Sequence, residues 1–576
     1  MSSKSSEIVV GIDFGTTHSG VSWAVNGGSK VIRLINNWPD PAAQNASKDK
    51  VPSAISYING KPQKWGYTVG LTDESFKWIK ILLEENHKYV TTVEPVKDSN
   101  TLLRKVDKTA HEVVADYLRL LWDYTIDDIR KFHPTFQDIF ALRVVLTVPA
   151  IWSHAAKDKT LQAARLAGMP DDIRLVTEPE AAALATLKEK AEENSLKVGD
   201  AFVVCDAGGG TVDLISYEVK QLNPLKIKEC AIGSGGLCGS VFLDASFQQY
   251  IATIVGETEY NNIKESNRKK MMREFEYGIK RTFSEKNDQV YSVDLRGVKD
   301  DPKNNIIDDT ITVKMSALRA VFDHVSLQIE SLVADQIAEV SEKGLTVKSI
   351  LLVGGFGENR YLYDRLVKCH TQDGVQVMQV NGAWSSICRG ATLWGLEHSE
   401  LTSVVSSPTV TSRLSRYSYG MAFSHPYDPK KHLVEDCYLD TSDGSYQAKD
   451  QMEWLLKRGE EVEEGKILQT ACIVTVQVGF WDRGMRVFQQ QLYYNDEPKP
   501  PTRKTNAVHT LCTVNFGADC DKLWLERSFK SPVTKTKHRN AVFKLFIILG
   551  NAALDYVVMY KDDVLAHVEA EYAEKF

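Results

Sequence analysis

Residues 205–214 read CDAGGGTVDL, and a related stretch, GIDFGTTHSG, occupies residues 11–20. Each follows an apolar run typical of a buried strand, and each places an aspartate, Asp206 or Asp13, just before glycines and threonines. The glycines let the backbone approach an anion, while threonine hydroxyls and backbone N–H groups can bind phosphate oxygens. Because a carboxylate repels polyphosphate, two such aspartates beside two such loops predict a Mg²⁺ ion held largely through water.

The segments around these two stretches alternate between strand and helix patterns over the first 400 residues or so. An amphipathic helix is expected over 109–131 and a longer one over about 315–342. Residues 143–148 and 349–353 are apolar runs typical of buried strands. This alternation predicts an α/β fold.

The pattern changes near residue 400. Residues 401–412 are rich in Ser, Thr and Val, as in a linker or a first edge strand. Beyond them, short β-type runs separated by turn residues predict a small β-sandwich or barrel. These runs cover 419–423, 471–480, 485–494, 510–516, 542–549 and 555–560, and a proline-rich loop is expected at 495–505.

The composition limits the class of protein. The chain has 576 residues, of which 43% are hydrophobic and 9% aromatic, so wholesale disorder is excluded. A net charge of -7 argues against a dedicated nucleic-acid binder, and nine cysteines without metal-type or paired spacing fit a reducing compartment. The apolar segment 541–560 contains Lys544, Asn551 and Asp555, so no membrane span is expected. We therefore expect a cytoplasmic protein, with the nucleus as the alternative.

Five motifs in a fixed order resemble the ATPase domain of the 70-kDa heat-shock chaperones, a family of the actin-like ATPase superfamily. Besides the two stretches above, they are LTVPAIWSHAAKDKTLQAARLAG at 146–168, RLVTEPEAAALA at 174–185 and ILLVGGFGENRYL at 350–362. The resemblance covers about residues 7–397 and implies ATP or ADP with Mg²⁺ as cofactors. It also implies a two-lobed actin-like (ribonuclease H-like) ATPase domain, with lobes at 7–190 and 191–397. The change of pattern described above adds a linker at 398–412 and a smaller β-rich domain at 413–576.

The resemblance implies roles for individual residues. Asp13 and Asp206 would hold the waters around Mg²⁺, and Lys77, with Lys80 as the alternative, would contact the γ-phosphate. The expected catalytic residues are Lys77, Glu178, Asp206 and Asp213, the last as an acceptor for the proton of the attacking water. The expected phosphate-binding residues are Gly15, Thr16, Thr17, Gly208, Gly209, Gly210 and Thr211, and Gly235 and Gly236 belong either to a further phosphate loop or to a plain turn.

The nucleoside end is less similar to the family. Lys280, Arg281 and Ser284 match its nucleoside-binding helix, and the helical spacing places Lys280 and Ser284 on one face. Gly354 and Gly355 would let the backbone approach adenosine, or would serve a strand-to-helix turn. Four residues depart from the family pattern, namely Tyr277, Phe356, Glu358 and Trp384. They leave the phosphate end intact and change the nucleoside pocket, where Phe356 would either stack on adenine or pack in the core.

The tail also departs from that of the usual chaperones, since residues 396–412 contain no acidic leucine-rich linker and no long helical pattern follows. The chain looks most like the divergent subfamily numbered twelve and its fungal relatives. We expect an ATP-binding, slowly hydrolysing switch of chaperone type, whose tail at 413–576 reads the nucleotide state and binds protein clients or signalling partners. The alternatives are a nucleotide-sensing scaffold with little turnover and a small-molecule kinase on the same fold, although the sequence has no acceptor motif. The sequence does not indicate whether the protein uses co-chaperones.

Overall fold

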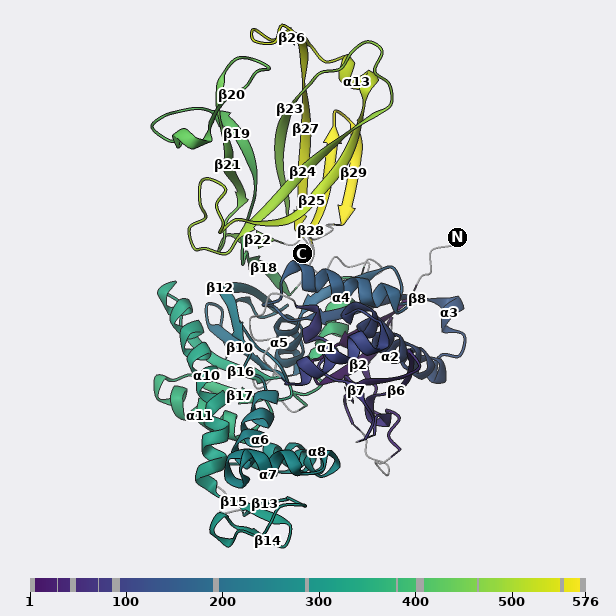
Figure 1. Cartoon of the computed structure of the whole chain (residues 1–576), viewed down its shortest axis with the longest axis vertical. Coiled ribbons are helices and arrows are strands. Elements are labelled where there is room, and N and C mark those ends of the chain that lie inside the picture. Colours follow the sequence, from purple (N-terminus) through teal and green to yellow (C-terminus); the bar gives the residue numbers. More distant parts are fainter. Residues whose placement is uncertain are drawn as a thin grey trace. The chain divides into compact units, whose positions relative to one another are not determined.

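The computed structural model describes residues 6–27, 30–41, 48–70, 72–84, 94–189, 196–284, 290–379, 382–399, 409–463, 466–549 and 554–569. The chain divides into two units, Met1–Val410 and Thr411–Phe576 (Figure 1). The change of pattern near residue 400 therefore falls close to the boundary between the units.

The first unit contains two sheets whose central strands come from different parts of the sequence. In the first sheet, β1 (Ser6–Asp13) pairs antiparallel with β2 (His18–Asn26) and parallel with β8 (Phe140–Val148). All but the first residue of β1 are buried, which explains its nearly continuous apolar run. The strand order is β3-β2-β1-β8-β9, and β4 also pairs with β2. Strand β3 covers Arg33–Leu34, β4 covers Val51–Pro52 and β9 covers Ile173–Thr177.

The second sheet repeats this arrangement. Strand β10 (Ala201–Ala207) pairs antiparallel with β11 (Val212–Gln221) and parallel with β16 (Val347–Val353). Within this unit the order is β17-β16-β10-β11-β12, with β12 at Lys226–Gly236 and β17 at Gln376–Gln379. Each sheet thus has an antiparallel hairpin flanked by parallel strands, and each central strand carries an aspartate at or next to its last residue. This duplication is the two-lobed actin-like architecture expected from the motifs.

Two helices connect the sheets. Helix α5 (Glu178–Glu189) and helix α12 (Ser386–Glu397) pack so closely that a Cβ atom on Gly390 would lie 1.7 Å from the carbonyl oxygen of Ala181. Helix α12 also covers the first sheet, since a Cβ atom on Gly11 would lie 2.5 Å from the backbone nitrogen of Thr392. Any side chain at either glycine would have to displace backbone atoms.

Further helices and two small sheets flank this core. Helix α2 (Ala110–Phe132) begins with a capping box between Thr109 and Glu112, and α10 (Met315–Glu342) packs on the second sheet (Figure 1). The other helices are α1 (Glu94–Val106), α3 (Phe136–Ile139), α4 (His154–Leu166), α6 (Val241–Val255), α7 (Glu257–Asn262), α8 (Glu265–Glu274), α9 (Lys280–Thr282) and α11 (Arg360–His370). The small sheets are β6-β5-β7, at Lys61–Trp65, Ile55–Ile58 and Ser75–Phe76, and β13-β15-β14, at Tyr291–Asp294, Thr310–Val313 and Ile306–Ile307.

The second unit is a β-sandwich. One sheet has the order β20-β21-β19-β24-β25, and the other has the order β23-β27-β28-β29 with β26 paired to β27. Its core takes buried residues from both sheets, among them Met421, Leu492, Val514, Phe543, Leu545 and Tyr556. The elements are β18 (Val410–Leu414), β19 (Ser418–Pro426), β20 (Cys437–Leu439), β21 (Tyr446–Leu456), β22 (Glu461–Glu463), β23 (Ile467–Val476), β24 (Met485–Asn495), β25 (His509–Asp519), α13 (Cys520–Trp524), β26 (Ser528–Lys530), β27 (Lys537–Leu549), β28 (Leu554–Tyr560) and β29 (Asp563–Glu569).

The six β-type runs predicted for this unit are confirmed as strands, and the structure selects the sandwich over the barrel. The sequence analysis missed the longer strands β21 and β29 and the three-residue strands β20, β22 and β26. Part of the predicted linker forms a strand, because Val410–Leu414 is β18, and residues 400–408 of it lie outside the described residues.

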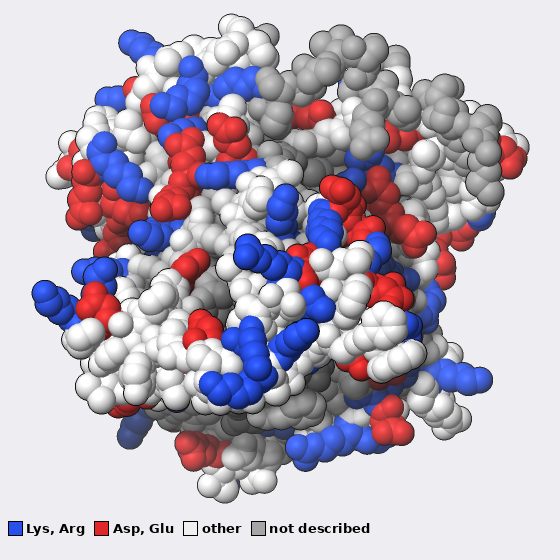
Figure 2. Space-filling model, turned by 90° about the horizontal axis from the view of Figure 1, so that it is seen from above, with Lys and Arg blue, Asp and Glu red and all other residues white. Residues whose placement is uncertain are grey.

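The surface charge and the helices can be compared with two expectations from the sequence, a small net charge and the absence of a membrane span. Figure 2 shows positively and negatively charged side chains interspersed over the face in view, as expected for a net charge of only -7. Among the helices in the described part of the chain, none is long and apolar enough to cross a membrane.

Candidate functional site

A cavity of about 40 Å³ lies at the ends of β1 and β10, between the two halves of the first unit. Its walls are formed by Asp13, Gly15, Thr16, Thr17, His18, Lys50, Lys80, Glu178, Asp206, Gly208, Gly209, Thr211, Gly354, Gly355, Trp384 and Ile387. Both glycine- and threonine-containing stretches predicted from the sequence therefore meet at one place. The volume suits one or two water molecules, so a larger ligand requires the two halves to move apart.

The first loop follows β1 and is fixed by hydrogen bonds from Ser53. The Ser53 N–H donates to the Thr17 carbonyl oxygen over 2.8 Å, and its hydroxyl donates to the Gly15 carbonyl oxygen over 2.7 Å. A Cβ atom on Gly15 would lie 2.2 Å from the His18 carbonyl oxygen, so only glycine permits this turn. The loop is thereby held with Thr16 and Thr17 in the cavity wall.

The second loop joins β10 to β11 and faces the first. A Cβ atom on Gly209 would lie 2.5 Å from Thr17 Oγ1, and one on Gly210 would lie 3.0 Å from Thr16 Oγ1. The threonines of one half thus lie against the glycines of the other. A phosphate chain placed between them would meet hydroxyl and N–H groups from both halves.

Three buried carboxyl groups, those of Asp13, Glu178 and Asp206, line this cavity, and a fourth, Asp213, stands opposite Asp206 on β11 outside the cavity wall. Burial, followed by the charges of Glu178 and Asp213, holds the pKa of Asp206 well above its usual range. Among the described residues, Asp206 Oδ1 has no hydrogen-bond partner, whereas Asp213 Oδ1 accepts the Ile151 N–H over 3.2 Å. Burial also raises the pKa of Glu178 to about 7, against the opposing effect of Lys80.

Two buried lysines pair with two of these carboxylates. The Nζ atom of Lys50 lies 2.5 Å from Asp13 Oδ2, and Lys80 forms an ion pair with Glu178. The side chain of Lys77 is exposed, and Lys77 is not part of the cavity wall. The structure therefore brings the alternative lysine, Lys80, to the expected catalytic carboxylate, and not Lys77.

The backbone between the two lysines explains this difference. Trp78 has a left-handed conformation, with φ 55°, and Lys80 immediately precedes a 3-10 turn at Ile81–Leu83. The backbone from Lys77 to Lys80 is neither helix nor strand, so no regular spacing relates the two side chains. Of the two, only Lys80 is carried inward, where it is 2% exposed.

The charges of the site fit a hydrated divalent cation. Four carboxyl groups meet only two ammonium groups here, and Asp206 Oδ1 is buried without a hydrogen-bond partner among the described residues. Burial and the neighbouring carboxylates hold the pKa of Asp206 high, and a nearby divalent cation would oppose this effect by favouring the ionised form. Within the described residues, no three His, Cys, Asp or Glu side chains lie close enough together to hold a metal ion directly. Because Mg²⁺ keeps several of its waters in such sites, Asp13 and Asp206 fit an ion that they bind through water.

Aromatic side chains line the cavity beside the loops. The rings of His18 and Trp384 meet edge to face with centroids 5.4 Å apart. The Arg281 guanidinium lies 5.8 Å from the Trp384 ring and 5.1 Å from the Tyr277 ring, so the three side chains form a stack next to the cavity. Aromatic and guanidinium faces of this kind can stack on a nucleobase.

The glycines of the adenosine-type motif lie at this end of the site. Gly354 has φ 82° and a Cβ atom on it would lie 2.3 Å from Asp206 Oδ1, so the position requires glycine. Gly355 lines the cavity next to Trp384, and a Cβ atom on it would lie 3.2 Å from the indole ring. Phe356, by contrast, is 3% exposed and belongs to the core of the second half, which excludes it from stacking on a base.

Lys280 and Ser284 are held away from the cavity wall. Lys280 forms an ion pair with Asp244 through contacts of 2.9 and 2.8 Å, and the buried Ser284 donates to Asp364 Oδ2 over 3.3 Å. The helix expected to present them contains a π-helical turn at Phe275–Ile279 and ends before Ser284. The expectation that both side chains face a nucleoside from one helix face is therefore corrected.

Gly235 and Gly236 also lie outside the cavity wall. They end β12, where they stand opposite Asp213 and Val212 of β11. A Cβ atom on Gly235 would lie 2.4 Å from the Val212 carbonyl oxygen, so close strand packing requires this glycine. Of the two interpretations left open by the sequence, the structure favours the purely structural one.

Lys50 and Ile387 line the cavity without having been singled out in the sequence. Lys50 reaches it because the following residues, Val51 and Pro52, pair with Ser19 and His18 of β2. That pairing joins residues more than thirty positions apart, and a single lysine before a short strand carries no local signal. Trp384 was noticed only as a departure from the family pattern.

The raised pKa of Glu178 predicts a pH-dependent stability. This pKa is about 7 in the folded protein against a usual 4.5, so folding takes up a proton between these values. The resulting stabilisation is complete below about pH 4.5 and is lost as the pH rises through about 7. We expect the melting temperature of the wild type to fall relative to that of Glu178→Gln between about pH 5 and about pH 8. Melting temperatures that change in parallel over this range would contradict the shift.

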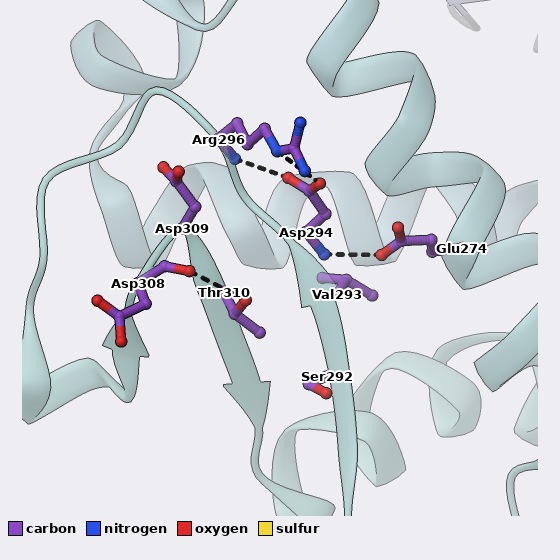
Figure 3. Close-up of a pocket in the computed structure, with 8 residues that line it drawn as sticks. All are labelled: Glu274, Ser292, Val293, Asp294, Arg296, Asp308, Asp309 and Thr310. Atoms are coloured by element: carbon purple, nitrogen blue, oxygen red, sulfur yellow. Dashed lines mark hydrogen bonds and ion pairs between the residues drawn. The ribbon is translucent and has the colours of Figure 1, made fainter.

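A larger hollow of about 490 Å³ lies on the small β13-β15-β14 sheet (Figure 3). It is lined by Glu274, Ser292, Val293, Asp294, Arg296, Asp308, Asp309 and Thr310. Several of its polar groups bond one another, as the Asp294 N–H donates to Glu274 over 2.7 Å and Arg296 pairs with Asp294 at 2.9 Å (Figure 3). It brings together none of the phosphate-type residues, so the cavity between the two halves remains the candidate site.

Two family models match this chain. One, described as Hsp70 protein, matches residues 134–366, and the other, described as a domain of unknown function (DUF8568), matches residues 413–574. The first match includes Glu178, Asp206 and the glycines of the adenosine-type motif. The second coincides closely with the β-sandwich unit.

Three curated proteins illustrate the range of similarity. Heat shock 70 kDa protein 12A of Homo sapiens is 24% identical over 553 residues, which cover 80% of this chain and 78% of that protein. Heat shock 70 kDa protein 12B of Homo sapiens is 26% identical over 314 residues, which cover 43% of this chain and 45% of that protein. Chaperone protein DnaK of Metamycoplasma hominis is 30% identical over 217 residues, which cover 37% of this chain and 31% of that protein. The latter two matches thus span less than half of each relative.

Proposed function

We propose that this chain binds ATP or ADP with Mg²⁺ in the cavity between its two halves and hydrolyses ATP slowly, a proposal supported by the match to the Hsp70 model over residues 134–366 and by the similarity to Hsp70 12A. The observation that carries this proposal is the meeting of two phosphate-type loops with three buried carboxyl groups and two buried lysines in one cavity wall. Separation of the two halves would admit the nucleotide, and their closure would exclude water from its phosphates.

In the proposed hydrolysis, the residues of the site have different roles. The loops containing Thr16, Thr17 and Thr211 bind phosphate oxygens, and bound Mg²⁺ supplies charge neutralisation of the phosphates. Lys80, fixed by its ion pair with Glu178, lies where it can orient the attacking water. Glu178 or Asp213 accepts the proton of that water, and a pKa of about 7 suits Glu178 to proton transfer near neutral pH. Hydrolysis then rests on positioning and electrostatic stabilisation.

We further propose a switch of chaperone type, in which the domain at 413–576 responds to the nucleotide state and binds protein clients or signalling partners. The similarity to Hsp70 12A over most of both chains supports this part of the proposal. The cytoplasm is the proposed location, with the nucleus as the alternative.

A second candidate is a nucleotide-sensing scaffold that binds nucleotide with little turnover. It is favoured by the engagement of Lys280 with Asp244 and of Ser284 with Asp364, since these side chains are then not available to a nucleoside in this conformation. Weaker nucleoside contacts would leave binding dependent on the phosphate end.

Single-turnover hydrolysis of ATP with Mg²⁺, combined with calorimetric binding, separates the two candidates. We expect Glu178→Ala to bind nucleotide within about threefold of the wild type and to hydrolyse it at least about 100-fold more slowly. Asp206→Asn should weaken binding of the Mg²⁺ complex, because one of the two water-holding carboxylates is lost. Asp308→Asn, in the exposed hollow of Figure 3, is the matched control and should behave as the wild type.

The outcomes for the wild type decide between the candidates. Binding with hydrolysis that depends on Glu178 supports the ATPase. Binding without hydrolysis above background supports the scaffold and contradicts the ATPase. Failure to bind either nucleotide would contradict both.

A further inference from the structure

Lys50 is held at the cavity by the segment that carries it. The following strand β4 pairs with β2, placing Val51 opposite Ser19, immediately after the first phosphate-type loop. The Tyr67 hydroxyl donates to the Lys50 carbonyl oxygen over 3.0 Å. On the stem of the side chain, Cγ of Lys50 lies 3.0 Å from the position that a Cβ atom on Gly20 would occupy. Backbone and stem are thus fixed, and the ammonium group enters the cavity wall.

The environment of this ammonium group differs from that of an ordinary surface lysine. Lys50 is 4% exposed and Asp13 is 1% exposed, and the distance from Nζ to Asp13 Oδ2 is 2.5 Å. A neighbouring lysine provides a contrast, since Lys48 pairs with Asp40 at 2.6 Å, retains 27% exposure of its side chain and is outside the cavity wall. Both lysines pair with one aspartate, but only Lys50 does so at the proposed nucleotide site.

Lys50 and a bound, hydrated Mg²⁺ ion would compete for the Asp13 carboxylate. If Asp13 holds water of a hydrated Mg²⁺ ion, its carboxylate can no longer serve the ammonium group alone. The anion next to the same loop is then the phosphate chain bound by Thr16 and Thr17. A buried ammonium group left without an anion is costly, so a shift of Nζ toward phosphate oxygen is favoured.

We propose that Lys50 is a nucleotide-binding residue whose ammonium group bonds phosphate oxygens and supplies part of the positive charge that Mg²⁺ otherwise provides. This rests on the proposed function of the cavity as a nucleotide site. The nucleotide then keeps substantial affinity without the divalent ion. A purely structural role, in which Lys50 only ties β4 to the end of β1, predicts instead that the effect of Mg²⁺ on affinity is the same with and without the lysine.

The dissociation constant of ADP, measured by calorimetry with Mg²⁺ and again with EDTA, tests the proposal without a contribution from hydrolysis. For the wild type, we expect EDTA to weaken binding by no more than about tenfold. In Lys50→Met, which keeps the length of the stem and removes the charge, EDTA should weaken binding by at least about 100-fold. Lys48→Met is the matched control and should show the wild-type ratio of the two dissociation constants.

Each result has a defined meaning. The same EDTA effect in Lys50→Met and the wild type would overturn the proposal, as would a loss of more than about 1,000-fold in the wild type itself. Even if Lys50→Met does not fold, which its melting curve would reveal, a loss of that size in the wild type still overturns the proposal. If the wild type binds ADP under neither condition, both the proposed function and this inference fail, whereas unchanged Mg²⁺ dependence with intact binding overturns the inference alone.

Discussion

Replacing Lys80 with methionine will slow single-turnover hydrolysis of ATP by at least about 100-fold, while binding of ADP changes by less than about tenfold. The reason is its position, since Lys80 is 2% exposed in the cavity wall and is paired with Glu178. Its loss removes a fixed positive charge from the place where the water and the γ-phosphate would meet. It also removes the charge that opposes protonation of Glu178, so the pKa of this carboxyl rises further.

The same substitution at Lys77 is the matched control. This lysine is three positions earlier, and its side chain is exposed outside the cavity wall, so Lys77→Met should keep the hydrolysis rate within about threefold of the wild type. Quenched-flow measurements at saturating ATP compare the three proteins directly. A large loss of rate in Lys77→Met together with a normal rate in Lys80→Met would reverse the assignment of the two lysines.

Replacing Gly390 with alanine will destabilise the first unit by about 3 kcal/mol or more. A Cβ atom at this position would lie 1.7 Å from the carbonyl oxygen of Ala181, and this obstacle is backbone of α5 that no side-chain rotation can move. The two helices would have to separate along their crossing, which also lifts α12 from the first sheet. Calorimetric melting of the full chain should show a lower transition temperature for this unit.

Gly278→Ala serves as the control for this prediction. Gly278 lies in a helical turn and is exposed, and a Cβ atom added to it would have no other atom within 4 Å. Alanine should therefore change stability by less than about 1 kcal/mol, with a gain expected from its better helix propensity. Equal melting temperatures for Gly390→Ala and Gly278→Ala would mean that the crossing of α5 and α12 is less tight than described.

The phosphate end of the site could be predicted from sequence because its signals are local. In both stretches the aspartate, the glycines and the threonines are within ten consecutive residues, directly after an apolar strand. The structure brings Asp13, Thr16, Asp206 and Thr211 into one cavity wall, as that pattern predicts. Six strands of the sandwich were recognisable for a similar reason, since each contains a continuous β-type run between turn residues.

The other parts of the site could not be predicted, because they depend on irregular backbone geometry and on pairing between strands that are far apart in the sequence. Spacing rules assume a continuous helix, and they fail for Lys280 and Ser284 because the helix ends at Thr282, before Ser284. The local match to the family motif could not separate Lys77 from Lys80, because which of the two side chains is buried depends on the irregular backbone around Trp78. Lys50 enters the site only through the pairing of β4 with β2, which no local pattern encodes.

Helix α12 covers the first sheet but is synthesised much later than the strands β1 and β2 of that sheet. The hydroxyl of Ser22, on β2, lies 2.7 Å from Thr392 Oγ1 and donates to the Cys388 carbonyl oxygen over 3.0 Å, contacts that span 370 and 366 positions of the chain. The ribosome therefore releases β1 and β2 long before the helix that covers them. At about 5–20 residues per second this interval lasts roughly 20–70 s, during which an apolar sheet face stays bare on the nascent chain. The first sheet is therefore the part of this chain where aggregation during synthesis is most expected, until α12 has been made.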